Sequence, residues 1–237
     1  MAQLRASTSH FVPASLTSAL ICAACVAPGP ASVSGPQGME VVPEVVLAIH
    51  GGAGTILREN MSAEMDAQYR AALTEALLAG HAALEAGGDA LDAVEAAIRP
   101  MEDSSLFNSG RGAVLNDEGE VELDASIMSG AGGQAGAVAG ARTPRHPITL
   151  ARRVMAESPH VLFAGEGADR FAAHHDLEIM EPSWFVTPRR SRQLKRMKAQ
   201  DAAATADLAS HPVDDKFGTV GCVALDGDGH LAAGTST

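Results

Sequence analysis

The strongest pattern in the sequence is the stretch Phe217-Gly218-Thr219-Val220-Gly221-Cys222-Val223-Ala224-Leu225-Asp226-Gly227-Asp228-Gly229-His230-Leu231-Ala232-Ala233-Gly234-Thr235-Ser236-Thr237. Two apolar runs flank an Asp-Gly-Asp-Gly turn, and this arrangement predicts a β-hairpin. Thr219 stands at the head of the first strand, directly after Gly218. We therefore expect Thr219 at the start of a buried strand, preceded by a residue with a freely adaptable backbone.

A threonine in this position also has a chemical interpretation. Cleavage of the Gly218–Thr219 peptide bond would leave Thr219 with a free α-amine, whose ordinary pKa is about 8. Such an amine can accept the proton of its own residue's hydroxyl at neutral pH and so activate the oxygen as a nucleophile. An ordinary strand residue and an autocatalytically exposed nucleophile are both consistent with the local pattern.

Upstream, strand and helix patterns alternate from Val45 onward. The run 45–49 predicts a buried strand that enters the turn His50-Gly51-Gly52-Ala53-Gly54. Apolar residues at helical spacing predict a helix from the N-cap Ser62 to the glycines at 87–88, and a second helix from Asp89 that ends near Pro100. Two successive helices after one strand argue against a doubly wound sheet.

The middle of the chain returns to strands. We expect strand-like segments at 113–115, 121–125 and 136–140, with a turn at 116–119, and helices at about 148–156 and 165–174. Between Arg189 and Lys198, six of ten residues are Arg or Lys. This run predicts a solvated helix end, and the polar stretch after it extends an exposed linker over about 189–218.

The balance of charged residues argues against some classes of binding partner. The 237 residues carry 17 basic and 29 acidic side chains, a net charge of −12. Such a charge opposes general binding to nucleic acid or to anionic lipid. We expect no nucleic-acid partner, and no membrane association once a leader has been removed.

Residues 1–44 differ in composition from the rest. An apolar run from Phe11 to Ala27 is followed by small residues up to Ala31, which is typical of a secretory signal peptide at 1–31 with a linker at 32–44. This pattern predicts a periplasmic or secreted protein, or a cytoplasmic one if the leader is not functional. A disordered N-terminal extension is the alternative.

The cysteines and histidines predict no catalytic metal. Cys22 and Cys25 lie in the predicted leader, and Cys222 lies in an apolar strand where a buried small side chain is the expected role. The nine histidines show none of the spacings that hold zinc.

Several segments together resemble the plant-type asparaginase and isoaspartyl peptidase family of N-terminal threonine hydrolases. The resemblance rests on the following segments, which cover nearly everything from Val45 onward: 50–54, Leu106-Phe107-Asn108-Ser109-Gly110-Arg111-Gly112-Ala113-Val114, 122–125, 136–140, 158–161, 165–168 and 218–237.

The resemblance implies an α+β fold, the αββα sandwich of N-terminal nucleophile hydrolases, incomplete at the C-terminus in this sequence. It implies a precursor that cuts itself before Thr219, giving an α-chain region over 45–218 and the start of a β chain at 219–237. Thr219 would be the nucleophile, Thr237 the second active-site threonine and Asn108 an asparagine beside the catalytic centre. A homodimer of αβ units is also implied.

A structural sodium ion is the one cofactor that the resemblance implies. The family's sodium loop, built mainly from main-chain carbonyls, would map onto Met101, Glu102, Ser104, Phe107, Ser109 and Arg111. An ordinary capped loop is the alternative, because main-chain ligands constrain the side chains little.

The implied activity is hydrolysis of L-asparagine and of β-aspartyl dipeptides. The family's substrate-binding and oxyanion-hole residues are expected beyond Thr237, so this chain alone is expected to be inactive, and its strand residues Val220, Val223 and Leu231 are expected to need cover from further strands. A glycosylasparaginase is the second interpretation, although that group usually has Asp where this chain has Gly218. A relative without activity is a third.

Two unrelated classes lack support. The Gly-Gly-Ala-Gly turn at 51–54 has neither the third glycine of a dinucleotide fingerprint nor the Lys-Ser/Thr of a phosphate loop. The Gly-Thr-Ser-Thr run at 234–237 lacks the second glycine and the following helix of a serine hydrolase elbow.

Overall fold

A computed structural model describes residues 45–52, 61–204 and 218–237, and for 202–204 the backbone alone. The predicted leader and linker at 1–44, and the second half of the predicted linker at 205–217, lie outside these residues. The strands are β1 Val46–His50, β2 Leu123–Ser129, β3 Ala135–Ala141, β4 Leu162–Ala164, β5 Val220–Leu225 and β6 Leu231–Ser236. The helices are α1 Ala63–Glu85, α2 Ala90–Asp103, α3 Pro147–Glu157, α4 Glu166–His174 and α5 Pro188–Ala204, with short 3-10 turns at Gly110–Gly112 and Pro182–Trp184.

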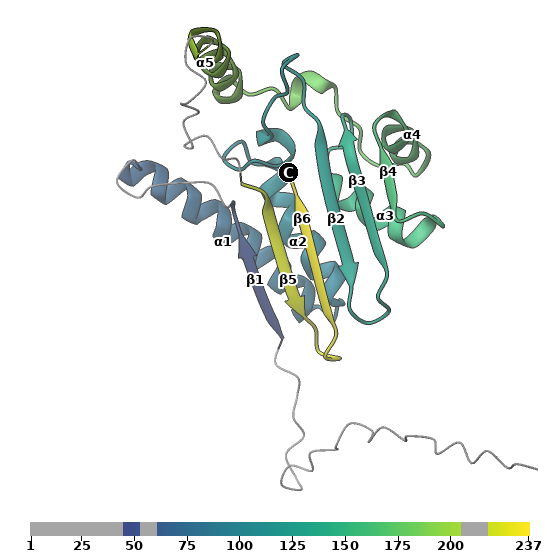
Figure 1. Cartoon of the computed structure of the whole chain (residues 1–237). Helices are drawn as coiled ribbons and strands as arrows, with labels where there is room; N and C mark the ends of the chain where they lie inside the picture. The colour runs from purple at the N-terminus through teal and green to yellow at the C-terminus, as the bar shows by residue number, and fades with distance from the viewer. Residues whose placement is uncertain (1–44, 53–60, 205–217) are drawn as a thin grey trace, which may run out of the picture. The chain divides into compact units, whose positions relative to one another are not determined.

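The six strands form one sheet in the order β1-β5-β6-β2-β3-β4 (Figure 1). All neighbouring pairs are antiparallel except β3 and β4, which run parallel. The predicted hairpin is confirmed as β5 and β6, and it lies between β1 on one side and β2 on the other. The last twenty residues therefore complete the middle of a sheet whose other strands come from much earlier in the chain.

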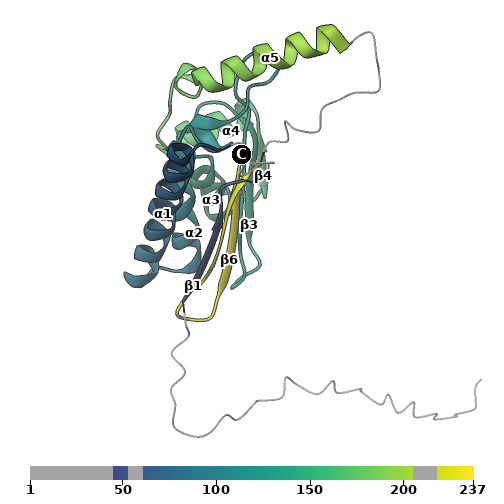
Figure 2. The same ribbon diagram turned by 90° about the vertical axis from the view of Figure 1, so that its left-hand side faces the viewer.

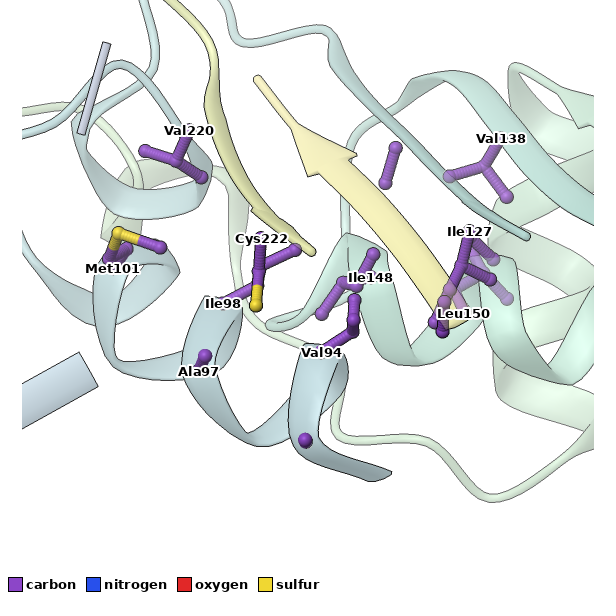
Figure 3. Close-up of a cluster of buried hydrophobic side chains, with 14 of the residues drawn as sticks. Val94, Ala97, Ile98, Met101, Ile127, Val138, Ile148, Leu150, Val220 and Cys222 are labelled. Carbon is purple, nitrogen blue, oxygen red and sulfur yellow. The ribbon is translucent and has the colours of Figure 1, made fainter. Parts of the chain in front are cut away.

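Helices α1, α2 and α3 lie on one face of this sheet (Figure 2). The predicted cap of α1 is confirmed, since the Ser62 hydroxyl accepts a hydrogen bond from the Met65 amide at 3.1 Å. Buried side chains of α2 and α3 pack against inward-facing residues of β2, β3 and β5 (Figure 3). The labelled members of this core are Val94, Ala97, Ile98, Met101, Ile127, Val138, Ile148, Leu150, Val220 and Cys222.

The opposite face of the sheet carries exposed apolar side chains. Val46, Met128, Val223 and Leu231 are each about half exposed there, while alternate residues of the same strands are buried. The expectation for Val220 is wrong, because this side chain points to the helices and is fully buried. The described residues supply one helical layer and one sheet layer of the α+β sandwich.

The strand predicted at 45–49 is not buried, because β1 is the outermost strand beside β5 and its residues alternate between exposed and half-buried. Three further local predictions need correction. The second helix continues past Pro100 to Asp103, because the proline lies in the last turn, where its missing N–H removes one helical bond and buried Met101 and Glu102 hold the chain. The segment 113–115 is no regular strand, and only Leu115 forms a bridge, to Val121, around the confirmed turn.

The third correction concerns the basic run, which belongs to the 17-residue helix α5 and not to an extended linker. Arg190 is buried, and its Nε donates to the Gly112 carbonyl at 2.6 Å. Burial, together with the neighbouring Arg189 charge, lowers the pKa of Arg190 to about 10. The start of this predicted linker is therefore anchored to the loop that carries Asn108.

Within the described ranges, no helix is long and apolar enough to span a membrane.

Candidate active site

Thr219 lies immediately before β5 and is partly buried. The antiparallel pairing of Val220 with Ser236 continues the register by one residue and brings Thr219 opposite Thr237. Side chains alternate along a strand, so these two threonines lie on the face of the sheet opposite the helices. The structure thus brings together two of the three predicted catalytic residues.

Asn108, in the loop after α2, contacts Thr237. Its Nδ2 donates to the Thr237 Oγ1 at 3.0 Å, and its Oδ1 accepts from the Val114 amide at 2.8 Å. Thr237 is held on its other side by a pair of backbone hydrogen bonds with Asp124. The asparagine and the threonine are therefore fixed relative to each other across 129 positions of sequence.

The turn after β1 also approaches the predicted cleavage bond. A Cβ at Gly52 would lie 3.6 Å from the Gly218 Cα, an ordinary van der Waals separation, so the turn lies next to the residue that precedes Thr219. The His50 ring covers Gly221, where any side chain would collide with its Nε2. The His-Gly-Gly motif is recognisable in the sequence, but its position beside the predicted cleavage bond is not, because that position depends on the pairing of β1 with β5.

Thr235 shares the strand face of Thr237 but makes a separate contact. Its hydroxyl forms a 3.0 Å hydrogen bond with the Ser126 hydroxyl of β2. This pair extends the polar surface of the face that carries Thr219.

A buried polar layer lies on the helix side of β6, and sequence analysis did not find it. The Ser109 hydroxyl donates to the Ser236 hydroxyl at 2.8 Å, and the Ser236 hydroxyl donates to Glu102 Oε1 at 2.6 Å. Burial raises the pKa of Glu102, although hydrogen bonds from His146, Ser236 and Ile148 favour its charged form. The one sequence signal that this carboxylate would face the core was its position four residues after Ile98 and eight after Val94, on the apolar face of the helix.

The predicted sodium loop folds tightly upon itself. A side chain at Gly110 would meet the carbonyl oxygen of Glu102, and one at Gly112 would meet those of Phe107 and Ser104. Main-chain oxygens of three residues of the predicted sodium loop thus lie close to two glycines. For side-chain ligands, the described ranges contain no cluster of three or more His, Cys, Asp or Glu residues.

Cys222 is buried beneath the hairpin, as predicted. Burial raises the pKa of its thiol to about 12, so it stays protonated at neutral pH and is inert as a nucleophile.

A threonine that follows a glycine, heads a central strand and faces a second threonine held by an asparagine is typical of hydrolases with an N-terminal nucleophile. The asparaginase family model matches residues 43–237. The isoaspartyl peptidase of Salmonella typhimurium is 48% identical over 196 residues, which are 82% of this chain and 62% of that protein. The chain belongs to the asparaginase family.

Other relatives with the same kind of name also match this chain. The isoaspartyl peptidase of Escherichia coli is 46% identical over 82% of this chain and 61% of its own length. The isoaspartyl peptidase/L-asparaginase of Xenopus laevis is 42% identical over 81% of this chain and 59% of its own length. The chain spans about three fifths of the length of the curated relatives it matches.

Proposed function

We propose that the protein cleaves itself before Thr219 and then hydrolyses L-asparagine and β-aspartyl dipeptides. The hydrogen bond between Asn108 and Thr237, opposite the head of β5, is the observation that carries this proposal. The family membership and the names of the relatives support the substrate class.

The cleavage step is an acyl shift within the chain. The Thr219 hydroxyl attacks the Gly218 carbonyl carbon, the peptide C–N bond breaks and an ester forms on Oγ1, while the nitrogen becomes the α-amine. Water then hydrolyses the ester and leaves Gly218 as a carboxylate. The glycine before Thr219 supports this step, because the backbone of Gly218 can adopt the strained geometry that the attacked peptide bond needs.

The same hydroxyl then acts on the substrate. Thr219 Oγ1 attacks the side-chain carbonyl of the aspartyl group, and the α-amine accepts the hydroxyl proton and passes it to the departing amine. The leaving group is ammonia from asparagine or the second residue of a dipeptide. Water hydrolyses the β-aspartyl ester, so that aspartate leaves and Thr219 is restored.

Asn108 fixes which hydrogen-bonding role the Thr237 hydroxyl takes. Because Asn108 Nδ2 donates to Thr237 Oγ1, the Thr237 hydroxyl keeps its own proton available for Thr219 opposite. The Val114 amide holds the other end of the carboxamide, so the donor cannot rotate away without losing that bond.

The nucleophile is tested by substitution in the protein expressed from its complete reading frame. Thr219→Ala should remain one uncut chain, and N-terminal sequencing of the wild-type small fragment should begin at Thr219. Thr219→Ser should retain turnover, because it keeps the hydroxyl and the α-amine. Thr219→Val, supplied as two separate chains, should have none. Turnover of either substrate by the Val variant would refute the assignment, as would complete loss of wild-type activity with a chelator.

We also propose that the loop 101–111 binds a structural sodium ion. Its crowded carbonyls support this, and replacing sodium chloride by tetramethylammonium chloride at equal ionic strength should lower the melting temperature. An unchanged melting temperature would refute it.

Two further proposals rest on the sequence and the family. The first is export through cleavage of the leader 1–31, tested by sequencing the N-terminus of the mature protein. The second is a homodimer of αβ units, tested by light scattering.

A further inference from the structure

Two neighbouring residues of one loop contact Ser236, the last residue of β6, and Thr237 directly after it, one pair on each face of the sheet. Asn108 binds Thr237 at 3.0 Å, and Ser109 binds Ser236 at 2.8 Å. Ser109 and Ser236 are fully buried, on the face that the helices cover. Because successive strand residues point to opposite faces, the serine pair lies beneath the pair that the proposed mechanism uses.

The buried pair is anchored to a carboxylate. Ser236 donates to Glu102 Oε1 at 2.6 Å, and the same oxygen accepts from the Ile148 amide at 2.9 Å. Glu102 Oε2 lies 3.2 Å from His146 Nδ1. One fully buried carboxylate thus joins the last turn of α2, the first turn of α3 and the end of β6.

This anchor has a geometric consequence for the exposed pair. The backbone units 108–109 and 236–237 are joined on both faces, so neither can twist about its axis while both bonds persist. Loss of the lower bond leaves Asn108 and Thr237 connected by a single hydrogen bond near the end of a strand. An error of about 1 Å in such a group can cost about 100-fold in rate.

We propose that Glu102, acting through Ser236 and Ser109, is a positioning residue that fixes Thr237 and Asn108 for the chemistry at Thr219. The inference rests on the proposed function, and it assigns a role to side chains that the sodium loop does not require. The positioned groups serve the nucleophile and not the binding of substrate, so their displacement affects kcat more than KM.

The test compares Ser236→Ala with Ser129→Ala in the protein expressed from its complete reading frame. Ser129 is a buried serine on the same sheet face, near the other end of β2, and serves as the matched control. Ser236→Ala should lower kcat on L-asparagine about 10- to 100-fold, per cleaved chain, with KM within about threefold of wild type. Ser109→Ala, which removes the buried Ser109–Ser236 bond and leaves the Ser236–Glu102 bond, should lower kcat less. Ser129→Ala should leave both constants unchanged.

The outcomes separate this inference from the function beneath it. If the wild type is cleaved and active and the Ser236→Ala variant has the same kcat, the inference is overturned but the proposed function is not. The same holds if Ser129→Ala lowers kcat as much as Ser236→Ala does. A wild type with neither a Thr219 terminus nor hydrolysis overturns the proposed function and this inference with it. If Ser236→Ala lowers the melting temperature by many degrees, the kcat of the Ser109→Ala variant is the deciding measurement. A wild-type kcat in the Ser109→Ala variant overturns the inference.

Discussion

Gly234→Ala should destabilise the protein, because Gly234 lies where β6 crosses α2 and α3. A Cβ there would lie 2.6 Å from Val94 Cγ1, 3.1 Å from Ile148 Cδ1 and 3.2 Å from Ile98 Cδ1. Carbon atoms in good contact are about 3.5–4.0 Å apart, so Val94 must move by roughly 0.9 Å or more. All three neighbours are fully buried, so none can swing into solvent.

Overpacking of this kind costs about 1–3 kcal/mol, while replacing glycine by alanine in a strand recovers about 0.5–1 kcal/mol of chain entropy. The two ranges leave a net loss of up to about 2.5 kcal/mol in the free energy of unfolding, and we expect at least about 1 kcal/mol because three buried side chains lie too close to the added Cβ. The assay is urea unfolding followed by circular dichroism, in the Thr219→Ala background so that the polypeptide stays uncut. Gly227→Ala, whose Cβ would meet nothing within 4 Å, is the control and should change stability by less than about 0.5 kcal/mol.

A double mutant identifies the cause. Val94→Ala removes the closest methyl, so Gly234→Ala should cost at least about 1 kcal/mol less in that background. Full stability of the single Gly234→Ala variant, or an equal cost with and without Val94, would refute the packing of α2 on β6.

Three further results are expected. Asp226 is buried, which by itself raises the pKa of its carboxyl, but backbone N–H groups, including that of Ala90 at 3.0 Å, outweigh burial and lower it. The charged carboxylate should therefore contribute to stability above the ordinary Asp pKa of about 4, and this contribution should disappear as the pH falls through the lowered value. Asp226→Asn should cost about 1–2 kcal/mol of unfolding free energy at pH 7 and less near pH 3. Urea unfolding at both pH values measures this cost, and a cost independent of pH would contradict the prediction. Cys222 should resist iodoacetamide at pH 8 in the folded protein and react only after unfolding, and mass spectrometry of its peptide detects the difference. Asn108→Ala should lower kcat on L-asparagine about 10- to 100-fold, because the Thr237 hydroxyl loses its donor; a wild-type rate in the cleaved variant would exclude Asn108 from the mechanism.

Most of the local structure could be predicted from sequence, because it depends on neighbours in the chain. Ser62 caps α1, the turn at 226–229 sets the register of β5 against β6, and this register places Thr219 opposite Thr237. The family followed from motifs of the same local kind. The helix end predicted near Pro100 was wrong, because the effect of a proline depends on the residues that follow it. Here the buried residues after Pro100 keep α2 helical for another turn.

The surroundings of the threonines depended on tertiary structure alone. Nothing near residue 108 in the sequence indicates that its carboxamide meets residue 237. That contact requires β2 to pair with β6 and the loop after α2 to reach the end of β6. The burial of Arg190 and the link from Glu102 to Ser236 arise in the same way. Hydrophobic periodicity shows which face of an element is buried but not which polar groups meet there, because long-range partners are chosen by the packing of whole layers.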